Sequence, residues 1–439
     1  MRGQSRMVLL FFLWLSIFLI IGAQPVQRHD TAEAEVVGET GDEGEESYDT
    51  GIDRTAEFDP YGIGAILDLD PSVKLQRRPD VAWNQSCNKF LAVYDRKRTD
   101  VDYDIWGRYI SGSGLVLGAG PFRLTTDGLK QQVPAIAYND AGDNYLVVWQ
   151  DNRDGNWEIY AQLWNCQKTN VNDALNLTNN ASHQLAPDVI CGYSAGEPVC
   201  WVVWEDFRDG NWNIYGQRLD GGGAVIGGNV QLTTNTRIQR APAIARNPEN
   251  TGCNPDGTFL VVWHDNRNAG KGYGYDIYGQ QLDNTGLCGL NMPIYAGLGD
   301  QLYPDIAYGT ANDHYQVVWQ DNRAGNWDVY ARRVLPSGSG DGLSFALGVA
   351  PNTQSRPAVA YDMNTNNQFL TVWEDLQAGT YDINSQRTSG LGALLGGWMI
   401  SATPDAETNP AVAFGSTADH YFVVWEDSTD GIQGRALWP

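Results

Sequence analysis

The sequence predicts an all-β fold: a seven-bladed β-propeller built of four-stranded antiparallel blades. Two observations predict it. One pattern occurs seven times along the chain, and its apolar segments are short and bounded by Gly, Asn, Asp and Pro. An aromatic residue closes the second apolar segment of each copy, at Tyr94, Trp149, Trp204, Trp263, Trp319, Trp373 and Trp425, with spacings of 52 to 59 residues. Repeats of this length that carry strands and no helical period stack radially as blades.

Each copy supplies three strands in order. The first follows a proline, at Pro79, Pro134, Pro187, Pro242, Pro304, Pro357 and Pro410. The second is apolar at every position, as in Leu146–Trp149, which indicates a strand covered on both faces. A hairpin of the type D-x-R-x-G-N then leads into the third strand. Later segments such as 122–126 and 230–234 supply the fourth strand, so each copy forms a four-stranded meander.

The ring of blades must also be closed. The last copy ends at Pro439 directly after its third strand, whereas Ala65–Leu69 precedes the first copy and has no blade of its own. We predict that this N-terminal segment is the fourth strand of blade seven, because an unpaired strand edge would otherwise remain at the seam.

The first sixty residues indicate export. Arg2 and Arg6 precede an apolar run over 7–21, and small residues follow it, which is typical of a secretory signal peptide cleaved after Ala23. A short membrane anchor is the alternative. Residues 24–60 contain twelve acidic residues and two arginines, which predicts an acidic disordered tether. The predicted domains are therefore 1–23 (signal peptide), 24–60 (tether) and 61–439 (propeller), in a secreted or cell-envelope protein.

Charge restricts the partners. The net charge is −24, and the basic residues are 23 Arg and only 6 Lys. No basic stripe is present to neutralise phosphates, so we expect no nucleic acid partner and no lipid binding beyond an N-terminal anchor. The partner that we expect is therefore a protein or a polysaccharide at the cell surface.

Six cysteines behind a secretory leader predict disulfides, with 15 formal pairings. The propeller reduces this number. Cys191 and Cys200 flank the hairpin between the first two strands of blade three, and Cys253 and Cys288 lie in bottom loops of blade four. Cys87 and Cys166 then remain, in bottom loops of neighbouring blades. No C-x-x-C or Cys/His cluster is present, so neither a metal site nor another cofactor is expected.

The D-x-R-x-G-N hairpins share the top face of a propeller with the loops between blades, and this face commonly binds ligands. Their arginines offer planar donors, and the aromatic residues that follow offer stacking surfaces. The candidate binding residues are Arg153, Trp157, Arg208, Trp212, Arg267, Tyr275, Arg323, Trp327 and Tyr381. The structural alternative is that Asp151 and its equivalents bind the turn backbone, Gly155 adopts a positive φ, and each arginine pairs with a carboxylate on the next blade.

Three further motifs are interpreted as structural. Gly192–Gly196 matches the G-x-S-x-G elbow of esterases, but it lies in a hairpin between two cysteines and lacks partner residues. His314 and His420 occupy matching Asp-His-Tyr positions in bottom hairpins. Residues 362–367 begin like a calcium loop but lack its distant glutamate, so we predict a plain turn there.

The chain resembles the WD40-like repeats of the TolB family in its hairpins. The residues that carry this resemblance are Asp151, Arg153, Gly155, Asn156, Ile159 and Tyr160 and their copies. The resemblance covers 61–439 and implies an envelope or extracellular interaction propeller. Two departures separate the chain from that family. The S-P-D-G turn survives only as residues 254–257, and no α/β domain precedes the propeller.

These observations favour an exported, non-enzymatic binding scaffold that contacts a protein or polysaccharide through its top-face loops. The alternative is a glycan-active enzyme, hydrolase or lyase, with carboxylates around the central pore. One pocket formed by residues that differ between blades, and holding two carboxylates about 5–10 Å apart, would favour the enzyme. Seven similar shallow sites would favour the scaffold.

Overall fold

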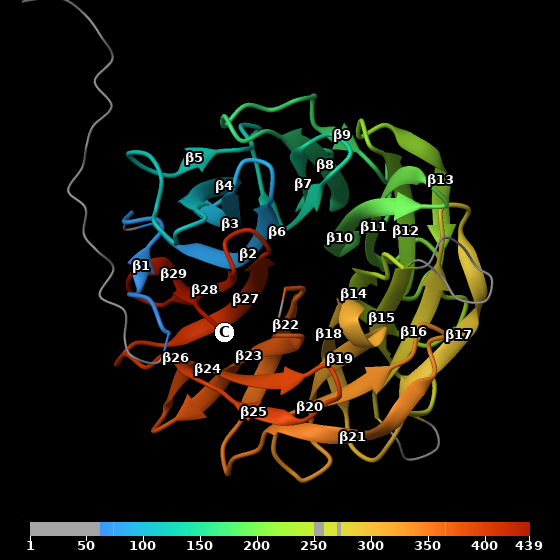
Figure 1. Ribbon diagram of the computed structural model, residues 1–439. Coiled ribbons are helices and arrows are strands. Elements are labelled where there is room, and N and C mark those ends of the chain that lie inside the picture. The colour runs from blue at the N-terminus through green and yellow to red at the C-terminus, as the bar shows by residue number, and fades with distance from the viewer. Residues whose placement is uncertain (1–61, 73, 250–258, 270–273, 365) are drawn as a thin grey trace, which may run out of the picture. The chain divides into compact units, whose positions relative to one another are not determined.

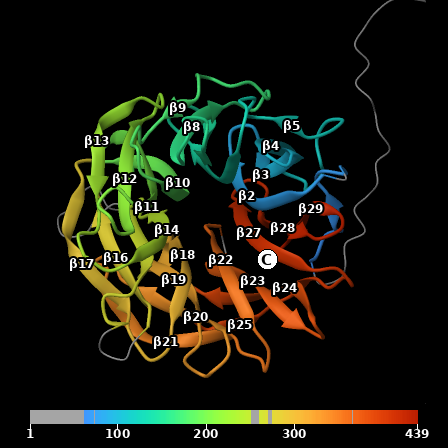
Figure 2. The ribbon, with the colours of Figure 1, turned by 180° about the vertical axis from the view of Figure 1, so that it is seen from behind.

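The computed structural model describes residues 62–72, 74–249, 259–269, 274–364 and 366–439. The predicted signal peptide and tether therefore lie outside the described residues. Seven antiparallel sheets stand around a common axis, which confirms the seven-bladed β-propeller (Figure 1; Figure 2 shows the opposite side). The described residues contain no α-helix, only the 3-10 helix η2 (Thr310–Asn312). None of the described helices has the length and hydropathy needed to cross a membrane.

The strands of each blade follow one another from the axis outward. Blade one contains β2 (Gln76–Asn84), β3 (Lys89–Thr99), β4 (Asp102–Ser111) and β5 (Phe122–Arg123), and blade two contains β6 (Gln131–Asn139), β7 (Asn144–Asp151), β8 (Glu158–Trp164) and β9 (Leu175–Asn176). Blade three contains β10 (Gln184–Ser194), β11 (Glu197–Asp206), β12 (Asn213–Asp220) and β13 (Val225–Gln231), and blade four contains β14 (Gln239–Arg246), β15 (Phe259–Asp265), β16 (Asp276–Leu282) and β17 (Leu287–Tyr295). Blade five contains β18 (Gln301–Gly309), β19 (His314–Asp321), β20 (Asp328–Val334) and β21 (Gly340–Gly348). Blade six contains β22 (Gln354–Asp362), β23 (Gln368–Gln377), β24 (Thr380–Ser389) and a divided outer strand, β25 (Leu394–Gly396) and β26 (Met399–Ser401).

Blade seven joins the two ends of the described chain. Its first three strands are β27 (Glu407–Gly415), β28 (His420–Asp427) and β29 (Gly431–Leu437), and its fourth is β1 (Leu67–Asp68). Leu67 pairs with Gly434, and an isolated bridge joins Ile63 to Leu437. The predicted closure by the N-terminal segment is confirmed, and the backbone groups on the outer edge of β29 are paired rather than exposed.

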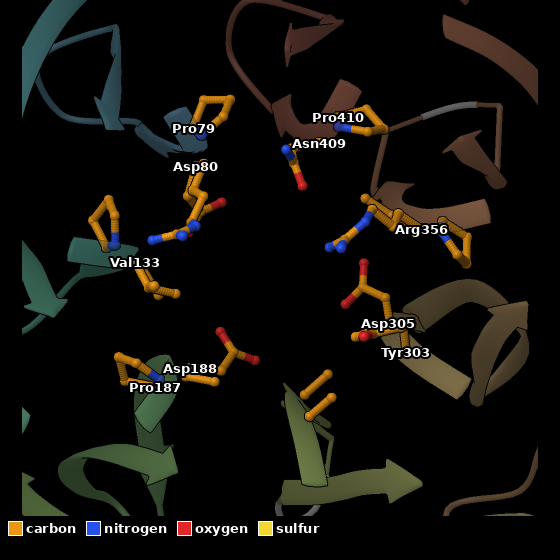
Figure 3. A pocket seen from close by; sticks show the side chains of 18 of the residues that line it. Pro79, Asp80, Val133, Pro187, Asp188, Tyr303, Asp305, Arg356, Asn409 and Pro410 are labelled. Carbon is orange, nitrogen blue, oxygen red and sulfur yellow. The ribbon is translucent and has the colours of Figure 1, made fainter. Parts of the chain in front are cut away.

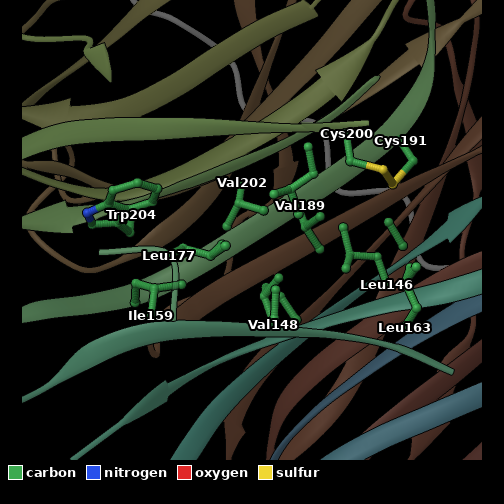
Figure 4. Packing of buried hydrophobic residues seen from close by; sticks show 14 of the residues in the cluster. Leu146, Val148, Ile159, Leu163, Leu177, Val189, Cys191, Cys200, Val202 and Trp204 are labelled. Carbon is green, nitrogen blue, oxygen red and sulfur yellow. A yellow bond between two sulfur atoms is a disulfide. The ribbon is translucent and has the colours of Figure 1, made fainter. Parts of the chain in front are cut away.

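The core lies between the blades. In β7, Val147 packs into the cluster shared with blade one, whereas Val148 packs into the cluster shared with blade three. Figure 4 shows the second cluster, in which Val148 faces Val202 across the interface. Because successive side chains of a strand point to opposite faces, both faces of the second strand are buried. This explains why the run is apolar at every position.

The disulfides follow the predicted pairing where both cysteines are described. Cys87–Cys166 joins bottom loops of blades one and two, with the Cα atoms 6.5 Å apart. Cys191 and Cys200 face each other in β10 and β11, with the Cα atoms 4.0 Å apart. Cys288 is also disulfide-bonded, but its predicted partner, Cys253, lies outside the described residues.

Candidate active site

A cavity of about 550 Å³ lies on the axis, where the seven inner strands begin. Every blade contributes the residue before its first-strand proline and the proline itself, and six of the seven blades also contribute the residue after it. Figure 3 shows this arrangement from close by, with Asp188, Asp305 and Arg356 directed into the space between the blades. Because the second strands end at the same side of the ring, the D-x-R-x-G-N hairpins surround the mouth of this cavity.

The residue before each proline has a left-handed backbone conformation. The φ angles lie between 49° and 53° at Arg78, Val133, Ala186, Ala241, Tyr303, Arg356 and Asn409. Each of these positions interrupts the pairing of the first two strands, which marks a β-bulge. A positive φ is costly for residues other than glycine, so surrounding bonds must hold the backbone in place.

Bonds between blades supply this support. The backbone N–H of each pre-proline residue donates to the side chain that follows the core aromatic of the preceding blade. Examples are Ala241 N to Glu205 Oε1 at 2.8 Å and Asn409 N to Glu374 Oε1 at 2.9 Å. The acceptor in blade four is His264, whose Nδ1 accepts from Tyr303 N at 3.4 Å. Burial, with the nearby Arg240 charge, lowers the pKa of His264 to about 3, so this imidazole is neutral and able to accept.

Three aspartates follow the prolines in alternate blades. Asp80, Asp188 and Asp305 stand in blades one, three and five, whereas the other four blades have alanine there. One oxygen of each carboxylate accepts the backbone N–H of the next residue, at 2.8 Å. The other oxygen accepts a backbone N–H of the following blade, from Ile136, Ile244 and Val359, at 2.7 to 2.8 Å. These bonds fix the three carboxylates in the cavity wall.

The cavity environment raises the pKa of all three carboxyl groups. The aspartates are partly accessible from the channel, but protein surrounds them on every other side, and the loss of hydration disfavours the charged form. This raises the pKa of Asp80 to about 6 and that of Asp305 to about 7. Desolvation also raises the pKa of Asp188 to about 8, and the charges of Asp305 and Asp80 add to this rise. The cavity thus holds carboxyl groups that differ in protonation near neutral pH.

The four predicted binding arginines lie in the hairpins and are engaged there. Arg153 donates from its backbone N–H to Asp151 Oδ1 at 2.9 Å, and its guanidinium pairs with Asp151 Oδ2 at 2.5 Å. The guanidinium also stacks on Tyr160 of the same blade, 4.3 Å from the ring centroid. Arg208, Arg267 and Arg323 repeat the pairing with Asp206, Asp265 and Asp321. The expectation that each arginine pairs with a carboxylate on the next blade is wrong. Each guanidinium pairs instead with the aspartate two residues earlier in the chain.

The expected turn chemistry is confirmed at Asp151 and at Gly155, which has a φ of 96°. The predicted aromatic residues Trp157, Trp212, Tyr275, Trp327 and Tyr381 are half-buried around the mouth. Trp212 packs beneath the Arg240 guanidinium at 4.8 Å, and Tyr275 meets His264 edge-on at 5.1 Å. Of the described residues that line the cavity, none belongs to the nine predicted binding residues. Ligand binding by these nine residues stays a prediction.

The remaining motifs have structural surroundings. Ser194 is buried in the turn between β10 and β11 and accepts a hydrogen bond from the Asn284 backbone at 3.2 Å. His314 Nε2 pairs with the Asp341 carboxylate, 2.8 Å from Oδ2, and His420 packs against Trp438. Asp362 accepts the Asn364 backbone N–H at 2.8 Å, as in a turn.

The sequence interpretation missed Asp80, Asp188 and Asp305 as site residues. All three lie in the first strands, directly after the prolines, and the repeat pattern could have identified them. The proline is the same in all seven copies, whereas the residue after it is aspartate in three copies and alanine in four. The residue after the proline therefore varies, although the proline beside it is constant. Such variation indicates a role other than the packing of blades.

No family model matches the chain, and no curated protein matches it. Solved structures do resemble it. The "Dos1 propeller" has 11% identity and a TM-score of 0.48, over 85% of this chain and 93% of that chain. The α-L-arabinofuranosidase arb93a of Fusarium graminearum has 13% identity and a TM-score of 0.49, over 73% and 94%. The intramolecular trans-sialidase of Ruminococcus gnavus has 6% identity and a TM-score of 0.45, over 83% and 94%. At these values the likeness concerns the fold, and kinship with TolB-type repeats is not confirmed.

These findings correct one expectation. Several of the solved structures with this likeness are named as glycan-active enzymes, among them a sialidase, a trans-sialidase and two arabinofuranosidases. The chain itself has one axial cavity whose lining differs from blade to blade and includes the carboxyl groups of Asp80, Asp188, Asp305 and Glu426, so the sites are not seven similar shallow ones. The expectation of a non-enzymatic scaffold is therefore wrong.

Proposed function

We propose that this protein is a glycan-active hydrolase whose reaction takes place in the axial cavity. Four carboxyl groups line the cavity, and the observation that carries the proposal is that the pKa values of three of them, Asp80, Asp188 and Asp305, are raised to different extents. Hydrolysis of a glycosidic bond requires one carboxylic acid to protonate the leaving oxygen and one carboxylate on the opposite side of the sugar ring. Groups whose surroundings separate their pKa values are suited to these two roles.

Asp188 is the proposed general acid. Its pKa of about 8 keeps the carboxyl protonated at neutral pH. Each of its oxygens accepts one backbone N–H, from Val189 and Ile244, so an oxygen lone pair remains to carry the proton toward the cavity. In the reaction this proton moves to the glycosidic oxygen as the bond to the sugar carbon breaks.

Asp80 is the proposed carboxylate partner. Its pKa, about 6, is the lowest of the three, so it is the group most fully ionised at neutral pH. As a carboxylate it stabilises the positive charge that develops on the sugar ring, while a water molecule supplies the hydroxyl group that replaces the leaving group on the sugar carbon and the proton that restores Asp188. Asp305 raises the pKa of Asp188 through its charge and contributes no proton in this scheme.

Two finer points belong to the same proposal. The disulfides between described cysteines are consistent with an oxidising compartment, and the N-terminal residue pattern supports export by a signal peptide. The D-x-R-x-G-N hairpins, each locked by one aspartate, support kinship with TolB-type repeats at the level of the blade.

The test is the release of reducing ends from a polysaccharide panel by the full chain. Asp188→Asn is expected to lower turnover by at least about 100-fold, because general acid catalysis is removed. Asp100→Asn is the matched surface control, since the Asp100 side chain is 95% exposed.

A second control addresses folding. Asp305→Asn removes the same type of bond between blades that Asp188→Asn removes, because both carboxylates accept a backbone N–H of the next blade. Equal losses of turnover in the Asp188 and Asp305 variants would show that only the structural bond matters. Absence of turnover by the wild-type chain across the panel would overturn the proposed hydrolase.

A further inference from the structure

The pre-proline side chains divide the mouth of the cavity into two unlike halves. Blades two, three and four supply only small apolar side chains, Val133, Ala186 and Ala241. Blades five, six, seven and one supply Tyr303, Arg356, Asn409 and Arg78, and these blades are consecutive because β27 of blade seven lies beside β2 of blade one. We call these four residues the donor arc, since each carries N–H or O–H groups.

The backbone directs the donor arc into the cavity. Arg78 N–H donates to Glu426 at 3.3 Å, and Arg356 N–H donates to Gln320 at 3.1 Å, so both bulges are held from the preceding blade. Figure 3 shows Arg356 and Asn409 pointing into the channel from the side opposite Asp188. The backbone of both arginines is therefore held by the fold, independently of the ion pairs of their side chains.

The two arginines of the donor arc are weakly engaged. Among the described residues, the only ion pairs of Arg78 and Arg356 are with Asp95 at 3.4 Å and with Glu374 at 3.6 Å. Their side chains are 37% and 49% exposed. The Arg356 guanidinium also lies over the Tyr303 ring, 5.0 Å from its centroid, which orients its plane without using its N–H groups.

Two neighbouring arginines provide a contrast. Arg240 pairs with Glu205 at 2.7 Å and stacks on Trp212. Arg77 pairs with Asp95 at 3.1 Å and stacks on Tyr103. Both hold their carboxylate partners more closely than Arg78 and Arg356 do, so the guanidinium groups of the donor arc are the more available ones for a ligand in the cavity. A planar guanidinium with unused N–H groups is suited to bidentate contact with a carboxylate.

We propose that the substrate is an acidic glycan, and that Arg78 and Arg356 bind the carboxylate of a uronic acid unit in the axial cavity. This inference rests on the proposed function, since it assigns the substrate class to the same site. A sugar unit held by the donor arc lies across the channel from Asp188. The apolar half of the ring, with its small side chains, leaves room for the sugar ring itself.

The test is calorimetric binding of oligomers of galacturonate and of glucuronate, each compared with its carboxyl-reduced neutral counterpart. The Asp188→Asn variant and the wild-type chain both serve as receptors, so that binding is measured with and without turnover. We expect at least one acidic oligomer to bind about 10-fold more tightly than its neutral counterpart, as for a charge-assisted pair. Arg78→Gln and Arg356→Gln are each expected to abolish this preference and leave the neutral oligomer unchanged.

The matched control is Arg237→Gln, because Arg237 is exposed in the connection between blades three and four and does not line the cavity. Arg356→Lys keeps the charge but loses the planar fork, and it should retain part of the preference. Melting temperatures of all variants show whether they fold.

Five results decide between the claims. Equal affinity for acidic and neutral oligomers, or a preference that survives both glutamine substitutions, overturns the acidic-glycan inference. A sulfated neutral oligomer that binds more tightly than either uronate overturns the carboxylate assignment. Turnover of neutral glycans alone leaves the hydrolase standing and the inference refuted. Selective binding of uronates without turnover leaves the inference standing and refutes the hydrolase.

Discussion

The protonation of the cavity aspartates can be tested without a substrate, through the pH dependence of stability. Burial raises the pKa of Asp80 from 3.8 to about 6 in the folded protein. Between these values the folded state holds a proton that the unfolded state has released. The free energy of unfolding therefore falls as the pH rises from about 4 to about 7, and the stabilisation present at low pH is lost.

The magnitude follows from the difference between the two pKa values. At about 1.4 kcal/mol per pKa unit, Asp80 alone contributes a loss of about 3 kcal/mol between acid and neutral pH. For a folded region of this size, that corresponds to a decrease in melting temperature of about 4 °C. Asp188 and Asp305 act in the same direction, because their pKa values are raised further, to about 8 and about 7.

The assay is calorimetric unfolding of the wild-type chain and of Asp80→Asn from about pH 4 to about pH 9. Asparagine does not titrate, so the variant should lose about 3 kcal/mol less than the wild type over this range. Other buried carboxyls, such as Glu205 and Glu374, are present in both proteins, so the difference reports on Asp80 and on its charge coupling to Asp188 and Asp305, which acts in the same direction. Parallel pH profiles of the two proteins would refute the raised pKa and, with it, the acid–base scheme for the cavity.

Three other perturbations test the site and the fold. Asp305→Asn removes a negative charge near Asp188, so the upper limb of the pH–activity profile should move to lower pH while Asp100→Asn leaves it in place; an unmoved limb would contradict the charge coupling. Trp319→Ala should destabilise the protein by about 3–5 kcal/mol, because this fully buried ring leaves a cavity between blades, and a loss in chemical denaturation below about 1 kcal/mol would contradict its packing role. Deletion of 61–75 should cause aggregation in light scattering, since it removes β1 and exposes the edge of β29, whereas deletion of 24–55 should not; equal behaviour of the two deletions would refute closure by β1.

The repeat carried most of the information about the fold. Seven aromatics at nearly constant spacing, each ending a run that is apolar on both strand faces, predict a ring of blades, because the repeats supply no helices and radially stacked blades cover both faces of one another. The segment at 65–69 has no blade of its own, and the last copy has three strands and lacks a fourth. Together these two features predict that the segment closes the ring. The pairs Cys87–Cys166 and Cys191–Cys200 follow once the blades are placed.

The site was decided by the tertiary structure. Asp80, Asp188 and Asp305 are more than a hundred residues apart in the chain, and they share one cavity only because the ring returns to its start. The direction of Arg78 and Arg356 depends on a left-handed backbone at a bulge, which the residue before a proline does not favour on its own. Contacts from the preceding blade impose that conformation. The repeated residues therefore determine the structure of each blade, and the sequence alone is enough to predict it. The candidate site consists of residues that differ between the seven copies, and only the closed ring brings them together at the axis.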